Sequence, residues 1–185
     1  MAYLKSKVPP RKNDEKGPEH YYGEALKFNR HDFEAKIEFT NILVETSKHK
    51  ALRQLEDAAK IHHGSSGRSK PELLNNIAVL QIDNGQYEEA EKNFVECLGL
   101  IDSSNPDNEE DELKKKSLSI LCRFNYGICL EKLGHWHGAC EVYQGIVNEN
   151  KYHLDSYCRL AYSLSKLGDV EKMAAAFELA ERSCS

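Results

Sequence analysis

The sequence has no long apolar run. None of its apolar stretches approaches the roughly 18 residues that a membrane-spanning helix requires, and the N-terminal stretch MAYLKSKVPPRKNDEKGPEH lacks the apolar core of a secretory signal. These absences argue against a membrane protein and against a secreted one. We therefore expect no membrane partner and a cytoplasmic or nuclear address.

Catalytic motifs are also missing. The sequence contains no H-E-x-x-H, no G-x-S-x-G, no P-loop and no Rossmann glycine run. His135 and His137 are two residues apart with no third metal ligand nearby, and the acidic residues Glu109 to Glu112 lack the glycine-punctuated spacing of a calcium loop. We therefore expect a chain that is not an enzyme, with no catalytic residue, no cofactor, no metal site and no small-molecule substrate.

Positive charge is outnumbered by negative charge. Lys and Arg number 25 against 30 Asp and Glu, which gives a formal net charge of −5. A nucleic-acid-binding surface needs clustered cations, so no direct nucleic-acid contact is expected. No C-x-x-C occurs among the six cysteines, most of which fall at small or apolar helical positions, and this pattern favours reduced core thiols.

What the sequence does contain is a repeated helical pattern, clearest from Pro71 to Leu100. Counting Pro71 as position 1, small residues fall at positions 8, 20 and 27, glycine at 15, and aromatics at 17 and 24, namely Ala78, Ala90, Cys97, Gly85, Tyr87 and Phe94. Small residues let two antiparallel helices approach closely, and glycine allows the turn between them. This pattern is typical of a tetratricopeptide repeat. One such helix pair cannot bury its apolar face alone, so neighbours are expected on both sides.

The same pattern recurs along the chain. Gly168 lies 34 residues after Gly134, which is one tetratricopeptide period. The predicted fold class is all-α, a tetratricopeptide-repeat right-handed solenoid of antiparallel helix pairs. We predict a flexible leader at 1–18 and a tetratricopeptide-repeat domain at 19–185, with a half unit at 20–32, units at 33–61, 71–104, 120–153 and 154–185, and an extended helix or insertion at 105–119.

Two places depart from the regular pattern. Ser47 stands where the turn glycine of its unit would be, so that turn is predicted to be one residue shorter, and His62 to Lys70 is predicted to be a polar linker. Further on, EEDELKKK places three acidic residues four positions before three lysines, which supports a helix. We expect the first helix of unit 120–153 to extend backwards by two or three turns; a charged docking patch is the alternative.

Some stretches are more specific than the repeat pattern. They are DFEAKIEFTNIL, PELLNNIAVL, EAEKNF with the enlarged connection after it, RFNYGICLEKLGHWHGACEVYQGIV and YHLDSYCRLAYSLSKLGD. Across Asp32 to Ala180 the sequence resembles the large tetratricopeptide subunit of the RNA polymerase II-associated factor (Paf) complex, which acts in transcription elongation. The resemblance implies a nuclear, non-enzymatic scaffold that binds protein subunits of a multiprotein complex. This chain would then be an internal segment of a longer repeat protein.

The predicted fold suggests where a partner would bind. The first helices of successive units line a concave groove, and asparagines there can hydrogen-bond the backbone of an extended peptide. An ordinary solvated polar surface is the alternative. The candidate groove residues are Glu38, Asn41, Asn75, Asn76, Val79, Asn125 and Arg159.

The alternative function is a cytoplasmic, co-chaperone-like adaptor that binds a short peptide in the groove. Co-chaperone repeat domains capture a C-terminal carboxylate with two lysines, two asparagines and an arginine. The corresponding positions here are Asn75, Val79, Asn125, Asp155 and Arg159. Both lysines are missing and Asp155 would repel a carboxylate, so the carboxylate clamp fits poorly.

Overall fold

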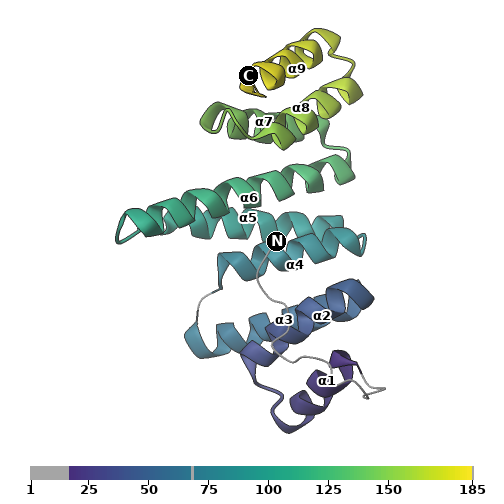
Figure 1. Ribbon diagram of the computed structural model, residues 1–185, viewed down its shortest axis with the longest axis vertical. Coiled ribbons are helices and arrows are strands. Elements are labelled where there is room, and N and C mark those ends of the chain that lie inside the picture. Colours follow the sequence, from purple (N-terminus) through teal and green to yellow (C-terminus); the bar gives the residue numbers. More distant parts are fainter. Residues whose placement is uncertain (1–16, 68, 185) are drawn as a thin grey trace. The chain divides into compact units, whose positions relative to one another are not determined.

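The computed structural model describes residues 17–67 and 69–184 (Figure 1). Every regular element in these residues is an α-helix, which confirms the predicted all-α class. The chain divides into two compact units, one ending at Gly85 and the other beginning at Gln86. The boundary therefore falls inside the repeat predicted from Pro71 to Leu100. Residues 1–16, which make up most of the predicted leader, lie outside the described residues.

The described part of the first unit is built from α1 (Pro18–Phe28), α2 (Phe33–Thr46), α3 (Lys48–Ser66) and α4 (Pro71–Asp83). Helix α2 packs against both α1 and α3, and α4 packs against α3. Apolar side chains from all four helices form one core, made of Leu26, Phe39, Leu43, Ala51, Leu52, Leu55, Leu73, Ile77 and Leu80. Helix α1 joins it through Leu26 and through Tyr22, whose ring stacks on Phe39.

The turn between α2 and α3 consists of Ser47 alone, as the shorter turn predicted from the sequence requires. Ser47 has an extended backbone with φ −159°, whereas Gly134 and Gly168 at the corresponding turns of the second unit have φ 76° and 75°. A side chain is disfavoured in the left-handed region but not in the extended one. The shorter turn therefore removes the need for glycine at this position.

Helix α3 continues past Ile61, so the prediction that the whole of His62 to Lys70 is a linker was wrong. The helix ends at Ser66, and Gly67 follows it with a left-handed φ of 67°. The hydroxyls of Ser65 and Ser66 donate to the carbonyl of His62 at 2.9 and 2.8 Å. Serine and glycine composition indicated a loop, but here these hydroxyls bond back to the carbonyl of the preceding turn while the helix is maintained.

The start of the first compact unit also differs from the prediction, by one residue. Helix α1 begins at Pro18, inside the predicted leader, with Gly17 as its N-cap residue. Proline is well tolerated at the first helical position because its missing N–H is not needed there. The proline that suggested a flexible segment therefore starts a helix.

The described part of the second unit contains α5 (Tyr87–Ser103), α6 (Glu109–Leu133), α7 (Trp136–Glu149), α8 (Leu154–Leu167) and α9 (Val170–Cys184). Each helix packs against the next. The buried core between α6 and α9 consists of Leu130, Ala139, Tyr143, Ile146, Val147, Tyr157, Leu160, Ala161, Leu164 and Ala176.

The long helix α6 confirms the predicted backward extension. It begins at Glu109, eleven residues before Ile120, which corresponds to about three turns. Asn108 caps it by accepting a hydrogen bond from the Asp111 N–H at 2.9 Å. Two of the three expected ion pairs form, from Glu110 to Lys114 and from Glu112 to Lys116. The third does not, because Lys115 donates instead to the carbonyl of Ser104 at 2.6 Å.

Candidate partner-binding surfaces

Three of the predicted groove residues lie on α4. Asn76 is exposed, Val79 is half-buried and Asn75 is buried, with only 3% of its surface exposed. The amide of Asn75 donates to the side-chain oxygen of Asn76 at 3.2 Å. The buried Asn75 thus orients the side chain of Asn76. Of these two asparagines, Asn76 is the one whose amide is exposed to a partner.

Two further predicted residues, Glu38 and Asn41, are exposed on α2. Glu38 accepts a hydrogen bond from the hydroxyl of Tyr22 on α1. This bond to a carboxylate, with a smaller effect of burial, raises the pKa of Tyr22 to about 12. Glu38 is therefore already engaged in fixing α1 to α2, whereas Asn41 projects into solvent.

In the second unit, Asn125 is half-buried on α6 and Arg159 lies on α8. The guanidinium of Arg159 donates to Oε2 of Glu131 at 2.9 Å, and the hydroxyl of Ser163 lies 3.4 Å from Oε1. The Glu131 side chain is only 5% exposed, against 42% for Arg159. A buried carboxylate needs a cationic partner, so part of the role of Arg159 is to neutralise Glu131.

A small pocket of about 330 Å³ surrounds this ion pair. It is lined by Glu131, Lys132, Trp136, Cys158, Arg159 and Tyr162. The rings of Trp136 and Tyr162 meet edge to face with centroids 6.0 Å apart, and the ammonium of Lys166 lies 5.1 Å from the centroid of Tyr162. Charged and aromatic groups at one opening are suited to holding a polar peptide segment.

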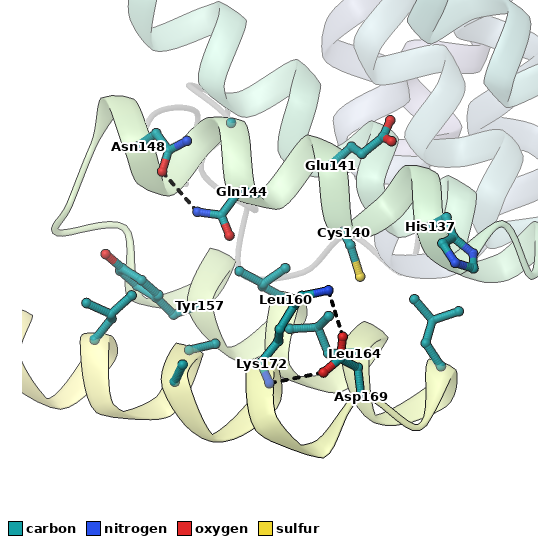
Figure 2. A pocket seen from close by; sticks show the side chains of 15 residues that line it. His137, Cys140, Glu141, Gln144, Asn148, Tyr157, Leu160, Leu164, Asp169 and Lys172 are labelled. Atoms are coloured by element: carbon teal, nitrogen blue, oxygen red, sulfur yellow. Dashed lines mark hydrogen bonds and ion pairs between the residues drawn. The ribbon is translucent and has the colours of Figure 1, made fainter.

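A larger pocket of about 720 Å³ opens between α7, α8 and α9 (Figure 2). Its apolar lining comes mainly from Tyr157, Leu160 and Leu164 of α8, together with alanine and leucine side chains of α9. Its polar lining includes Gln144 and Asn148, which hydrogen-bond each other at 2.9 Å. An apolar lining with a few polar groups is the usual composition of a binding pocket.

Two charged residues at this larger pocket, Asp169 and Lys172, form an ion pair with each other. Asp169 accepts a hydrogen bond from the backbone N–H of Lys172 and forms an ion pair with its ammonium at 2.8 Å, as Figure 2 shows. The pKa of Asp169 is lowered and that of Lys172 is raised, in both cases mainly by this contact. Burial, with a smaller effect of Asp169, raises the pKa of the Cys140 thiol. A raised pKa disfavours the reactive thiolate form of Cys140.

The groove prediction from sequence missed the larger pocket, although a local signal exists. The stretch MAAAF in α9 contains three successive alanines. Ala175 and Ala176 both line the pocket, and their short side chains leave space that a leucine or phenylalanine would fill. A run of small residues on a helix that packs against a repeat is thus a usable indicator of a hollow.

Buried thiols account for three of the described cysteines, namely Cys97, Cys122 and Cys129, as the reduced-core prediction expected. A hydrogen bond with Cys97, together with burial, raises the pKa of Cys122, and burial raises that of Cys129 to about 11. Cys158 differs because it is exposed on α8.

Across residues 17–67 and 69–184, no group of three or more His, Cys, Asp or Glu side chains is placed to hold a metal ion. None of the helices described here combines the length and apolar character needed to cross a membrane.

Comparison with known families identifies the repeated helices. One tetratricopeptide-repeat model matches residues 71–103 and 154–183, and a second matches 122–150. These are tetratricopeptide repeats. The matched ranges fall inside the units predicted at 71–104, 120–153 and 154–185. The full division into a leader and one repeat domain stays a prediction.

Two curated proteins are similar in sequence. The RNA polymerase-associated protein CTR9 of Caenorhabditis elegans is 30% identical over 145 residues, which is 75% of this chain and 13% of that protein. Tetratricopeptide repeat protein 1 of Schizosaccharomyces pombe is 36% identical over 110 residues, 60% of this chain and 9% of that protein. The chain thus spans only a small part of the length of either relative.

Solved structures share the fold. A crystal structure of the MamA protein has a TM-score of 0.70 at 11% identity and covers 90% of this chain and 81% of its own. A tetratricopeptide repeat protein from Parabacteroides merdae has a TM-score of 0.65 at 16% identity, covering 89% of this chain and 57% of its own. At these identities the likeness shows the tetratricopeptide-repeat fold alone.

Proposed function

We propose that this chain is a nuclear, non-enzymatic scaffold segment that binds protein subunits of a transcription-elongation complex acting with RNA polymerase II. The observation that carries the proposal is the similarity to RNA polymerase-associated protein CTR9, which extends over 75% of the chain. Tetratricopeptide repeats bury one face of each helix against their neighbours and leave extended surfaces for protein partners. The coarser role as a protein-interaction scaffold follows from the repeats themselves.

The proposed contact residues are polar side chains on first helices of the repeats, Asn41 and Asn76 in the first compact unit and Asn125 and Arg159 in the second. Asn76 and Asn41 present open side chains, Asn125 is half-buried, and Arg159 keeps nearly half of its side chain exposed beside Glu131. Side-chain amides accept and donate at once, which suits hydrogen bonding to the backbone of an extended segment.

A co-chaperone-like role gains no support from this geometry. The lysines of a carboxylate clamp are absent, Asn75 is buried, and Arg159 is paired with Glu131. A free C-terminal carboxylate would have to compete with a carboxylate that is already buried against the same guanidinium.

Affinity purification tests the proposal. The tagged chain is incubated with a nuclear extract, and bound proteins are identified by mass spectrometry. We expect recovery of RNA polymerase-associated elongation subunits, reduced several-fold by the double substitution Asn76→Ala and Asn125→Ala because two groove amides are removed.

The matched control is Asn105→Ala, which removes an exposed asparagine between α5 and α6. This variant should recover the same partners as the unaltered chain. Recovery of chaperones without elongation subunits would overturn the proposal. Equal recovery by the double variant would show that partners use another surface.

A further inference from the structure

A pocket in the first unit carries an unusual balance of charge. It has a volume of about 470 Å³ and opens between α2, α3 and the segment that ends α1. Apolar atoms of Leu26, Phe39 and Ile61 contribute to its lining. Around these apolar atoms lie four Lys or Arg side chains and one carboxylate. The pocket therefore has a formal charge of +3, whereas the whole chain has a net charge of −5. The charged residues of this basic pocket are Lys27, Arg30, Lys36, Lys60 and Asp57.

Lys36 is the most buried of these charges, with 9% of its side chain exposed. Its ammonium donates to Oε1 of Gln54 at 3.3 Å and lies 3.9 Å from a carboxylate oxygen of Asp57. An ammonium has three protons to donate, and the described residues supply no other polar partner for them. Because burying a poorly paired charge is costly, an anion bound in the pocket would relieve this cost.

The exposed cations of the basic pocket are also weakly neutralised. Lys60 lies 3.5 Å from the carboxylate of Asp57, which it shares with Lys36. Arg30 is exposed and has no ion pair within the described part of the chain. Lys27 is paired with Glu24 at 2.5 Å on the exposed surface of α1. One carboxylate thus serves two ammonium groups, and Arg30 is available for a ligand.

The repeat does not require a cation at this place. Lys36 is the fourth residue of its unit, counted from Phe33, where the tetratricopeptide pattern has an aromatic residue. The fourth residue of the unit beginning at Leu154 is Tyr157, which belongs to an apolar core. In the unit beginning at Ile120 it is Arg123, whose guanidinium is held by both carboxylate oxygens of Glu149 at 2.7 and 2.5 Å. The carboxylate oxygen paired with the Lys36 ammonium, from Asp57, is 3.9 Å away.

The pocket between α7 and α9 provides an internal comparison. The two pockets occupy corresponding places in the repeat pattern. Each lies between the second helices of two successive repeats and against the first helix of the later repeat: α7, α9 and α8 in one case, α1, α3 and α2 in the other. Three corresponding positions differ in chemistry between the two pockets, because Tyr157, Ala176 and Leu179 in one correspond to Lys36, Gln54 and Asp57 in the other. At these three positions the same groove of the fold is therefore lined by apolar side chains in one repeat and by polar or charged side chains in the other.

We propose that the basic pocket binds a glutamate-rich segment of a partner protein. Carboxylates pair with Lys36 and with Arg30 and Lys60 at the exposed edge, while the aliphatic part of each glutamate lies on the apolar lining. The cations come from three helices and from the connection after α1, and most are lysines. A lysine ammonium is a point charge without the planar fork that favours a single phosphate. Spread charge and an apolar lining suit several carboxylates of one peptide better than one small anion.

A peptide-binding measurement tests this inference independently of any elongation complex. The full chain is titrated into fluorescein-labelled hexaglutamate, and fluorescence anisotropy is followed, with labelled hexaglutamine as the neutral control. We expect binding of hexaglutamate at least tenfold tighter than that of hexaglutamine. The affinity should fall several-fold between low and physiological ionic strength, since exposed charges are screened by salt.

Variants locate the site. Arg30→Glu and Lys60→Glu are surface changes that should each weaken hexaglutamate binding about tenfold. Lys36→Met should weaken binding while leaving the thermal midpoint equal or higher, because it removes a poorly paired buried charge. Lys92→Glu, an exposed charge reversal on α5 in the other unit, is the matched control and should weaken binding by less than twofold.

Three results would overturn the inference. The first is equal binding of hexaglutamine, and the second is a loss with Lys92→Glu as large as the loss with Lys60→Glu. The third uses potassium phosphate and potassium chloride at equal ionic strength. Much stronger displacement of the peptide by phosphate would assign the basic pocket to a phosphate group instead of a glutamate-rich segment.

Discussion

Gly127 shows how one side chain can dictate the residue opposite it. A Cβ atom on Gly127 would lie 2.5 Å from Cε1 of Tyr143 on α7. Tyr143 is fully buried, and its ring also contacts Phe124 at a centroid distance of 5.9 Å. Protein interiors are packed at near-crystalline density, so the ring cannot withdraw without displacing its neighbours. Gly127 is therefore required by the tyrosine and not by any turn.

The substitution Gly127→Ala should lower the free energy of unfolding by about 1–3 kcal/mol, the usual cost of overpacking a core. The higher helix propensity of alanine offsets part of this, by up to about 1 kcal/mol. Urea unfolding followed by circular dichroism should show a lower midpoint with an unchanged slope.

Gly145 on α7 is the matched control. A Cβ there would meet nothing within 4 Å, so Gly145→Ala should leave stability unchanged or raise it by up to about 1 kcal/mol. Equal stability of the two variants would contradict the role given to the Tyr143 ring.

The buried hydroxyl of Tyr143 adds a polar constraint at the same place. Among the described residues, no group lies in hydrogen-bond geometry with it. Burial, followed by the nearby carboxylate of Glu131, raises the pKa of Tyr143. The phenol therefore stays neutral at physiological pH.

At the scale of the elements, an ion pair links α6 to α7. The guanidinium of Arg123 donates to both carboxylate oxygens of Glu149. This contact is the main cause that holds the pKa of Glu149 below its ordinary value of 4.5. The Glu149 side chain is 57% exposed, so solvent screens the interaction and limits its contribution.

The pH dependence of this link follows from the direction of the shift. Because the pKa of Glu149 is lower in the folded chain than in the unfolded one, the folded state binds fewer protons in acid. The contribution is fully present above the ordinary pKa and is lost as the pH falls through the lowered folded-state value. Arg123→Gln should therefore unfold more easily than the unaltered chain at neutral pH, and the difference should shrink as the pH falls below the ordinary pKa of a glutamate.

Urea unfolding of both proteins at several pH values measures this difference. Arg182→Gln is a suitable control because Arg182 forms only an exposed i,i+4 pair with Glu178 on α9. A constant difference between Arg123→Gln and the unaltered chain from neutral to acid pH would show that Glu149 is not the titrating partner.

For the molecule as a whole, packing is local along the sequence. Within each compact unit, the packing helix pairs of the described chain are consecutive elements. The cores of the two units share no residue. Repeat proteins of this kind are stabilised by each repeat and its immediate neighbours, so a defect in one core should stay near its origin.

Leu43→Ala, in the core of the first unit, tests this. Leu43 is 1% exposed, and removing its side chain should cost about 2–5 kcal/mol locally. Amide hydrogen exchange followed by mass spectrometry should become faster in α1 to α3 and stay unchanged in α8. Ile146→Ala, in the fully buried core of the second unit, should give the reverse pattern. A uniform increase along the chain after either change would indicate one global unfolding unit.

Local sequence determined the helices of this protein. Periodic apolar residues, the turn glycines Gly134 and Gly168, and charged residues four apart in α6 all act within a few residues, so the all-α repeat fold and the extension of α6 were predictable. The errors were also local. Serine and glycine in the segment after Ile61 indicated a loop, but hydroxyl groups that bond to the preceding turn are compatible with a helix end.

Only the tertiary structure decided which polar residues are available to a partner. Asn75 and Asn76 are adjacent and identical in type, yet one is buried and the other exposed. Arg159 is neutralised by Glu131, 28 residues away in sequence, and the cations of the basic pocket come from three helices and the connection after α1. Burial and charge pairing are set by neighbours that are distant along the chain, and a repeat pattern read within one unit does not include them.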